Sequence, residues 1–126
     1  LDQACRVLDA LIFDIKCLDS ARHKKATGVG SELILKNIGH VFEHFPELPV
    51  LIRTPVIPGF NDTEEDILGI REMIPRKANI RYEALTYHRM GQPKYGYLGR
   101  RYELEGVKAD EAFMKRLNIM LKTYEQ

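Results

Sequence analysis

The stretch Leu11–Lys16 (LIFDIK) decides the fold expected for this chain, because it is an apolar strand that carries an acid and a base near its end. Side chains alternate between the two faces of a strand, so Asp14 and Lys16 share one face and the apolar residues share the other. Charges are rarely set in a buried run without a partner or a ligand. The stretch therefore predicts either a functional site or an internal Asp14–Lys16 ion pair.

Two further apolar segments end in polar groups in the same way. Residues 50–56 lead into Ile57-Pro58-Gly59, which predicts a turn, and residues 79–87 lead into His88. Parallel β/α folds build their sites from the carboxyl ends of the strands and the loops that follow them. We therefore expect the three strand ends to meet at one site.

Amphipathic segments separate and follow the strands. Apolar residues at helical spacing predict a helix that begins at Ser31, as its N-cap, and ends at Phe45-Pro46. A second helix is predicted to begin after residues 61–65 and to break at Pro75, and a third to cover residues 109–124. The alternation of strand and helix predicts an α/β fold of about three parallel β/α units with right-handed crossovers.

Polar segments connect these elements. Residues 17–30 are predicted to form a loop with a short helical turn, and residues 88–108 a loop that interleaves basic and aromatic side chains. Such interleaving can bind nucleic acid, but Tyr and Arg are also frequent at the centres of protein interfaces. Docking of a protein partner is the interpretation that we favour, through Arg89, Lys94, Tyr95 and Arg100.

Length and composition limit the class of protein. The 126 residues suit a single domain, and no uncharged apolar run approaches the ~20 residues that span a bilayer. Nineteen basic and eighteen acidic side chains give a formal charge of +1, so we expect neither a membrane nor a nucleic-acid partner. Cys5 and Cys17 are the two cysteines, which indicates a reduced, cytoplasmic protein rather than a disulfide scaffold.

Metal binding is not expected from the cysteines and histidines. Cys5 and Cys17 lack the close spacing of metal ligands. His40 and His44 lie four residues apart, a spacing that can bind a metal on a helix, but no third ligand is placed to complete the site.

Several motifs occur together and in order, and they resemble the glycyl-radical-enzyme activating family, of which pyruvate formate-lyase activating enzyme is the best-known member. They cover nearly the whole chain and comprise Asp14-Ile15-Lys16, Thr27-Gly28-Val29, the segment Ile52–Asp62 (IRTPVIPGFND), the segment Leu85–Gly91 (LTYHRMG), Lys94-Tyr95 and Leu104–Val107. That family belongs to the radical S-adenosylmethionine superfamily. The resemblance implies the C-terminal part of a partial (β/α) barrel.

The resemblance also implies an activity for the parent protein. Such an enzyme reductively cleaves S-adenosylmethionine to a 5′-deoxyadenosyl radical, which abstracts hydrogen from a backbone glycine of a partner enzyme. The implied cofactors are S-adenosylmethionine and a [4Fe-4S] cluster. The implied partners are a glycyl radical enzyme, similar to pyruvate formate-lyase, and an electron donor such as flavodoxin or ferredoxin, in anaerobic metabolism.

The chain also departs from the family pattern. The CxxxCxxC loop that holds the cluster is absent, and so is the glycine-rich segment that contacts the amino group of the cofactor. Thr86 stands where many relatives have proline. Residues 1–126 are therefore expected to be the C-terminal half of an activating enzyme, a single truncated domain that binds no cofactor and is inactive by itself.

The family likeness implies roles for named residues. Asp14, Lys16, Arg53 and His88 are expected to bind S-adenosylmethionine, and no residue of this chain is expected to be catalytic. The alternative for Arg53 is a surface ion pair, and for His88 an ordinary polar contact.

Two other functions are compatible with the residues alone. In one, the chain is part of a β/α-barrel lyase or isomerase in which Lys16 is an amine nucleophile and Asp14 a base. In the other, it is a binding module whose Arg- and Tyr-rich loop recognises a protein.

Overall fold

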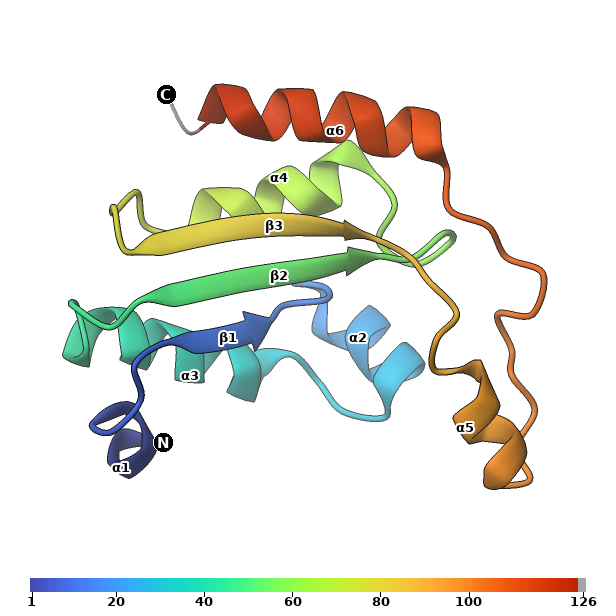
Figure 1. Cartoon of the computed structure of the whole chain (residues 1–126), viewed down its shortest axis with the longest axis horizontal. Helices are drawn as coiled ribbons and strands as arrows, with labels where there is room; N and C mark the ends of the chain where they lie inside the picture. Colours follow the sequence, from blue (N-terminus) through green and yellow to red (C-terminus); the bar gives the residue numbers. More distant parts are fainter. Residues whose placement is uncertain (125–126) are drawn as a thin grey trace.

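A computed structural model describes residues 1–124 of the chain. Its elements follow the order α1 (Asp2–Cys5), β1 (Leu11–Asp14), α2 (Ser20–Thr27), α3 (Glu32–His44), β2 (Val50–Val56), α4 (Glu64–Met73), β3 (Ile80–Thr86), α5 (Gln92–Tyr97) and α6 (Glu111–Tyr124). The three strands form one parallel sheet in the order β1-β2-β3 (Figure 1). The predicted α/β architecture of three parallel units is confirmed.

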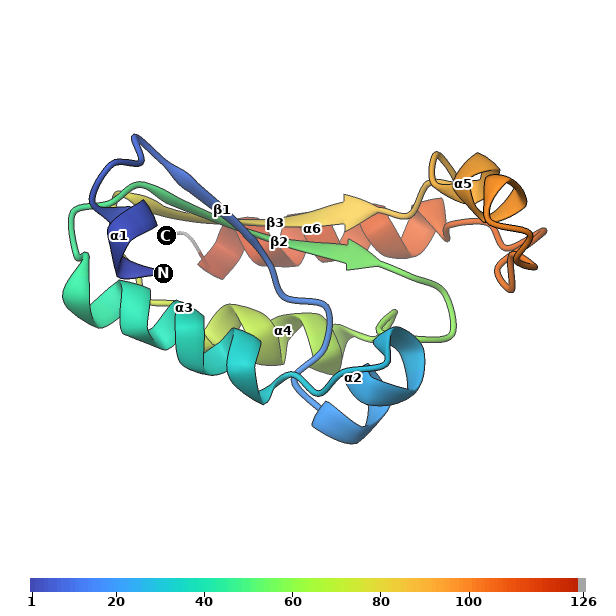
Figure 2. The same ribbon diagram turned by 90° about the horizontal axis from the view of Figure 1, so that it is seen from below.

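Helices cover one face of the sheet. Figure 2 shows α3 and α4 below the strands, and α6 runs alongside β3. Alternate residues of β2 are buried against these helices, because successive side chains of a strand point to opposite faces. The core that forms there includes Ile38, Val41, Ile52, Ile67, Ile70 and Leu117.

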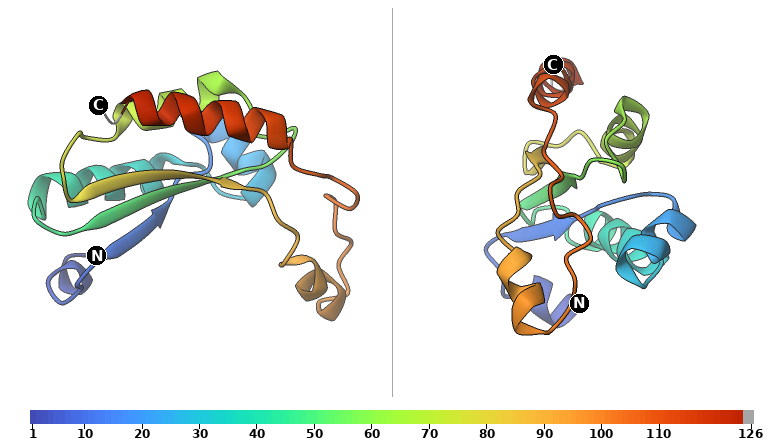
Figure 3. Two further views of the ribbon diagram at one scale, coloured as in Figure 1. Left: turned by 45° about the horizontal axis from the view of Figure 1, so that its top comes forward. Right: turned by 90° about the vertical axis from the view of Figure 1, so that its right-hand side faces the viewer.

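The opposite face of the sheet carries the charged residues of the strands. In residues 1–124 no helix lies over this face (Figures 2 and 3). Asp14 pairs in register with Arg53, and Arg53 pairs with Glu83, so the three residues form a row across the sheet. Asp14 is the last residue of β1, whereas Arg53 and Glu83 lie in the middle of β2 and β3, so the row crosses the sheet below the strand ends where the sequence predicts a site.

Three local predictions require correction. Ser31 precedes α3, but its hydroxyl donates to the carbonyl of Leu18 instead of capping the helix. Residues 20–27 form a full helix of eight residues, capped at its start by the side chain of Asp19 and ended by Gly28 at a φ of 88°. Gly28 takes the left-handed conformation that is common at the C-termini of helices and that glycine adopts readily.

The third correction concerns the segment after β3, which was predicted to be a loop. It contains the short helix α5, and Figure 1 shows that this segment projects beyond the carboxyl ends of the strands before the chain returns to α6. Within residues 1–124, none of the helices combines the length and the apolar character needed to cross a membrane.

Candidate functional site

The charged groups at the end of β1 and in the middle of β2 lie in contact. Arg53 donates to Oδ1 of Asp14 through Nε at 3.1 Å and Nη2 at 3.0 Å. The Lys16 ammonium donates to the other carboxylate oxygen at 3.3 Å. The structure therefore brings together Asp14, Lys16 and Arg53, three of the four residues expected to bind a cofactor.

These three side chains are half-buried, each with 36% of its surface exposed. Solvent screens ion pairs at this exposure, so each pair stabilises the fold by about 1 kcal/mol or less. Two cations share the Asp14 carboxylate, and each carries N–H donors beyond those that bind Asp14. The arrangement can bind a small molecule that carries a carboxylate, as a zwitterionic amino acid does.

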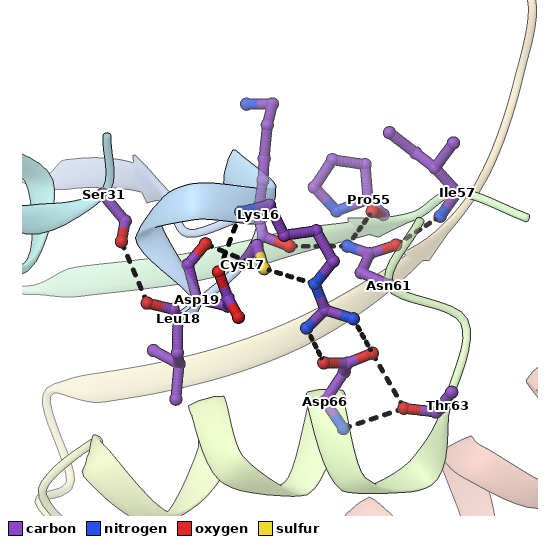
Figure 4. A network of polar contacts seen from close by, with 11 residues as sticks. Lys16, Cys17, Leu18, Asp19, Ser31, Pro55, Ile57, Asn61, Thr63 and Asp66 are labelled. Carbon is purple, nitrogen blue, oxygen red and sulfur yellow. Dashed lines mark hydrogen bonds and ion pairs between the residues drawn. The ribbon is translucent and has the colours of Figure 1, made fainter. Parts of the chain in front are cut away.

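The main chain beside Lys16 is held by buried side chains of β2 and the loop after it. Thr54 donates through its hydroxyl to the carbonyl of Ile15 at 2.7 Å. Asn61 donates through Nδ2 to the carbonyl of Lys16 at 2.7 Å (Figure 4). Both residues lie in the Ile52–Asp62 motif, and the sequence predicts that residues 56–62 shape the floor of the site, but it does not predict these two hydrogen bonds. The one local signal was an asparagine after a Pro-Gly turn, a position where amide side chains often bond the nearby backbone.

A second polar link joins α2 to α4. Arg22 binds the Asp66 carboxylate with both terminal nitrogens, one of them at 3.0 Å, and donates through Nε to Sγ of Cys17 at 3.2 Å (Figure 4). The hydrogen bond to Asp66 raises the pKa of the Arg22 guanidinium above its ordinary value. Thr63 caps α4 and also donates to Asp66 at 2.8 Å. The segment that follows Lys16 is therefore fastened to both neighbouring helices.

His88 lies apart from this cluster. It follows β3, is exposed, and lines a shallow cavity of about 420 Å³ together with Tyr87, Lys108 and Glu111. No hydrogen bond or ion pair described for residues 1–124 joins His88 to Asp14, Lys16 or Arg53.

The predicted docking residues lie on the projecting segment around α5. Arg89, Tyr95 and Arg100 line a shallow cavity of about 550 Å³, and Lys94 is exposed on α5. An aromatic cluster supports this segment: Tyr102 packs edge-on against Tyr95, with ring centroids 5.0 Å apart, and its hydroxyl hydrogen-bonds that of Tyr87. Burial, followed by the contact with Tyr102, raises the pKa of Tyr87 to about 12.

The cysteines and histidines outside this site have structural contacts. Cys5 and Cys17 are free and buried. His40 binds Asp2 through Nε2 at 2.7 Å and stacks on His44, with ring centroids 4.1 Å apart. Among residues 1–124, no three His, Cys, Asp or Glu side chains are grouped so that they could hold a metal ion.

Comparison with known proteins gives close relatives, although no family model matches the chain. Over all 126 residues it is 98% identical to the (2S)-3-sulfopropanediol sulfolyase activating enzyme of Bilophila wadsworthia, of which it covers 42%. Over 114 residues, or 90% of the chain, it is 45% identical to the isethionate sulfite-lyase activating enzyme of Nitratidesulfovibrio vulgaris, of which it covers 37%. The chain therefore spans about two fifths of the length of these relatives.

A solved structure has the same fold. A domain of a pyruvate-formate lyase-activating enzyme from Bacteroides vulgatus superposes with a TM-score of 0.71 at 27% sequence identity. The match covers 98% of this chain and 67% of that domain.

Proposed function

Because the homologues of this chain are glycyl-radical-enzyme activating enzymes, we propose that it is the C-terminal part of an enzyme that activates a (2S)-3-sulfopropanediol sulfolyase. Identity of 98% over the whole chain is the observation that carries this proposal. When bound and reduced, S-adenosylmethionine supplies the radical that takes a hydrogen atom from a backbone glycine of the sulfolyase. Residues 1–126 form one structural unit of this enzyme.

The chemistry of the charged cluster fits the amino-acid part of S-adenosylmethionine. Lys16 and Arg53 offer donors for its carboxylate, and Asp14 orients both cations through the hydrogen bonds that it accepts. His88 follows β3 and lies apart from this cluster, so we assign it to a different part of S-adenosylmethionine. The protein's contribution is orientation and charge complementarity, since the radical chemistry belongs to the cofactor.

The described residues do not fit an iron–sulfur cluster. Such clusters are held by several thiolates, and the two thiols of this chain, Cys5 and Cys17, are both buried; Sγ of Cys17 accepts a hydrogen bond from Arg22. The cluster ligands therefore belong to the part of the enzyme outside this chain. Residues 1–126 alone are inactive, and the whole enzyme receives its electron from a donor such as flavodoxin or ferredoxin in the cytoplasm.

The projecting segment around α5 docks the sulfolyase. Arg89, Lys94, Tyr95 and Arg100 are exposed on it, and a cluster of tyrosines holds it in shape. Tyr and Arg contribute strongly at interface centres, and an excess of basic side chains favours an acidic partner surface.

The test is reconstitution of the full-length enzyme with its cluster, followed by incubation with S-adenosylmethionine, a reductant and purified (2S)-3-sulfopropanediol sulfolyase. Electron paramagnetic resonance should detect a glycyl radical on the sulfolyase. Isethionate sulfite-lyase is the control and should gain much less signal under the same conditions. Absence of the radical on the sulfolyase, or an equal signal on both lyases, would contradict the proposed partner.

A further inference from the structure

Asn61 is a fully buried amide whose hydrogen-bonding groups are all used within the protein. Its Nδ2 donates to the carbonyls of Lys16 at 2.7 Å and Pro55 at 3.0 Å, and its Oδ1 accepts from the amide of Ile57 at 2.7 Å. Figure 4 shows the side chain placed between the end of β2 and the segment after β1. One planar group thus joins two segments of main chain, the end of β2 with the turn after it and the residues that follow β1.

The turn after β2 delivers Asn61 to this position. The amide of Phe60 donates to the carbonyl of Ile57 at 3.0 Å, and Gly59 has a φ of 77°, a conformation that side-chain-bearing residues rarely adopt. The chain therefore folds back directly after Pro58-Gly59. This places the side chain of Asn61, two residues after Gly59, against the carbonyl of Lys16.

Lys16 lies beyond the end of β1, so the sheet alone does not hold it. In the pairing of β1 with β2, the last hydrogen bond before Lys16 is donated by the Ile15 amide to the carbonyl of Arg53 at 3.0 Å. After that, the carbonyl of Ile15 is bound by Thr54 and the carbonyl of Lys16 by Asn61. The peptide groups on both sides of the Lys16 Cα are therefore held by buried side chains.

We propose that Asn61 is a positioning residue for S-adenosylmethionine: it fixes the backbone of Lys16, and through it the place of the Lys16 ammonium beside Asp14. This inference rests on the proposed function, in which Lys16 binds the cofactor. An asparagine suits the task because only an amide supplies two N–H donors for two carbonyls and an acceptor for a backbone amide at once.

Asn61→Asp removes the bonds from this side chain to the carbonyls of Lys16 and Pro55. The aspartate keeps an oxygen that accepts from Ile57, but it loses the donors that bind Lys16 and Pro55. Asn79→Ala is the matched control. Asn79 also donates to two carbonyls, those of Pro46 and Leu48, both at 2.9 Å, but it does so at the amino ends of the strands.

The experiment measures equilibrium binding of radiolabelled S-adenosylmethionine to the reconstituted full-length enzyme. Asn61→Asp should raise the Kd about 10-fold, and Asn79→Ala should change it less than about twofold. Hydrogen exchange of residues 15–19 should accelerate in Asn61→Asp and stay unchanged in Asn79→Ala. If Asn61→Asp does not fold, Thr54→Val removes the neighbouring bond to Ile15 and should raise the Kd about threefold.

A double-mutant cycle separates positioning from general destabilisation. If Asn61 acts through Lys16, then Asn61→Asp should add little to the loss of affinity caused by Lys16→Ala. Two results would overturn the role of Asn61 and leave the proposed function standing. One is that the losses of affinity in the two single variants add up in the double variant. The other is that Asn61→Asp binds with wild-type affinity while Lys16→Ala binds weakly. Wild-type affinity in Lys16→Ala would instead refute the binding role of Lys16, and the inference with it.

Discussion

Arg53 donates two hydrogen bonds to one carboxylate oxygen of Asp14, and these bonds join the end of β1 to the middle of β2 on the face of the sheet that carries no helix in residues 1–124. The pair is in register across the parallel strands, so the sheet itself sets its geometry. Lys16 shares the same carboxylate. Asp14 therefore fixes two donor groups whose remaining N–H bonds can bind an anion.

Arg53→Ala should weaken binding of S-adenosylmethionine to the full-length enzyme about 10-fold, because it removes one donor and releases Asp14. Arg53→Lys should lose less affinity, since it keeps the charge but not the planar pair of donors. Equilibrium binding measures both. The control is Arg81→Ala, which removes a cation from the same face of the sheet but nearer the amino ends of the strands. Equal losses of affinity in Arg53→Ala and Arg81→Ala would mean that the loss comes from removing a positive charge from this face of the sheet, not from removing a donor to the cofactor.

Arg100→Glu should lower the rate of sulfolyase activation about 10-fold at low sulfolyase concentration, because it reverses a charge on the proposed docking segment. The affinity for S-adenosylmethionine should stay within about twofold, since Arg100 lies on the segment between α5 and α6, whereas the proposed cofactor residues lie on β1 and β2 or directly after β1 and β3. The measurement is the initial rate of glycyl-radical formation against sulfolyase concentration. Lys115→Glu, an exposed charge reversal on α6, should leave both quantities unchanged.

Leu117→Ala should lower the free energy of unfolding by about 3 kcal/mol, because Leu117 is fully buried and its truncation leaves a cavity in the core. Ile119→Ala, two positions along the same helix, removes a side chain that is 60% exposed and should cost less than about 1 kcal/mol. Urea unfolding of the full-length protein compares the two variants. Similar losses would mean that α6 does not pack in the intact enzyme as it does in residues 1–124.

Tyr82 should make stability depend on pH in the alkaline range. Burial raises the pKa of Tyr82 to about 12, so between pH 10 and 12 the folded state holds a proton that the unfolded state releases. The contribution of this proton to the free energy of unfolding is complete below pH 10. It is lost as the pH rises toward 12, which lowers the free energy of unfolding by about 2 kcal/mol.

Tyr82→Phe should remove this dependence, and urea unfolding at pH 8 and pH 11 measures it. At pH 8 the variant should be at least as stable as the wild type, because the Tyr82 hydroxyl is buried and has no hydrogen-bond partner in residues 1–124. The exposed Tyr97 gives the control, Tyr97→Phe, which should keep the wild-type slope. A wild-type slope in Tyr82→Phe would show that other groups cause the alkaline loss.

Strands and long helices follow from the sequence because their signals are local. The apolar segment 50–56, which ends before the Pro58-Gly59 turn, predicts β2 without error in its bounds, and the apolar spacing before Phe45-Pro46 predicts where α3 ends. The contact between Asp14 and Lys16 follows from the same alternation. The helix α5 was missed because Pro93, Gly96 and neighbouring tyrosines are weak helix formers.

The supporting residues of the site depend on contacts between distant parts of the chain. Asn61 meets Lys16 across 45 positions, and Arg22 meets Asp66 across 44. No periodicity encodes such pairs, because they arise only when the strands lie side by side. Ser31 illustrates the same limit: it stands before a helix, where a cap is favoured, yet the nearby carbonyl of Leu18 takes its hydroxyl.

The projecting segment leaves the sheet after β3 and returns at the start of α6 (Figure 1), and Tyr102 within it hydrogen-bonds Tyr87, directly after β3. If this segment docks the sulfolyase as proposed, the side chains that recognise the partner are carried by a different part of the backbone from Asp14, Lys16 and Arg53. Partner recognition and cofactor binding can then be changed independently. Exchanging residues 89–107 between relatives is thus a direct test of whether this segment determines which lyase the enzyme binds.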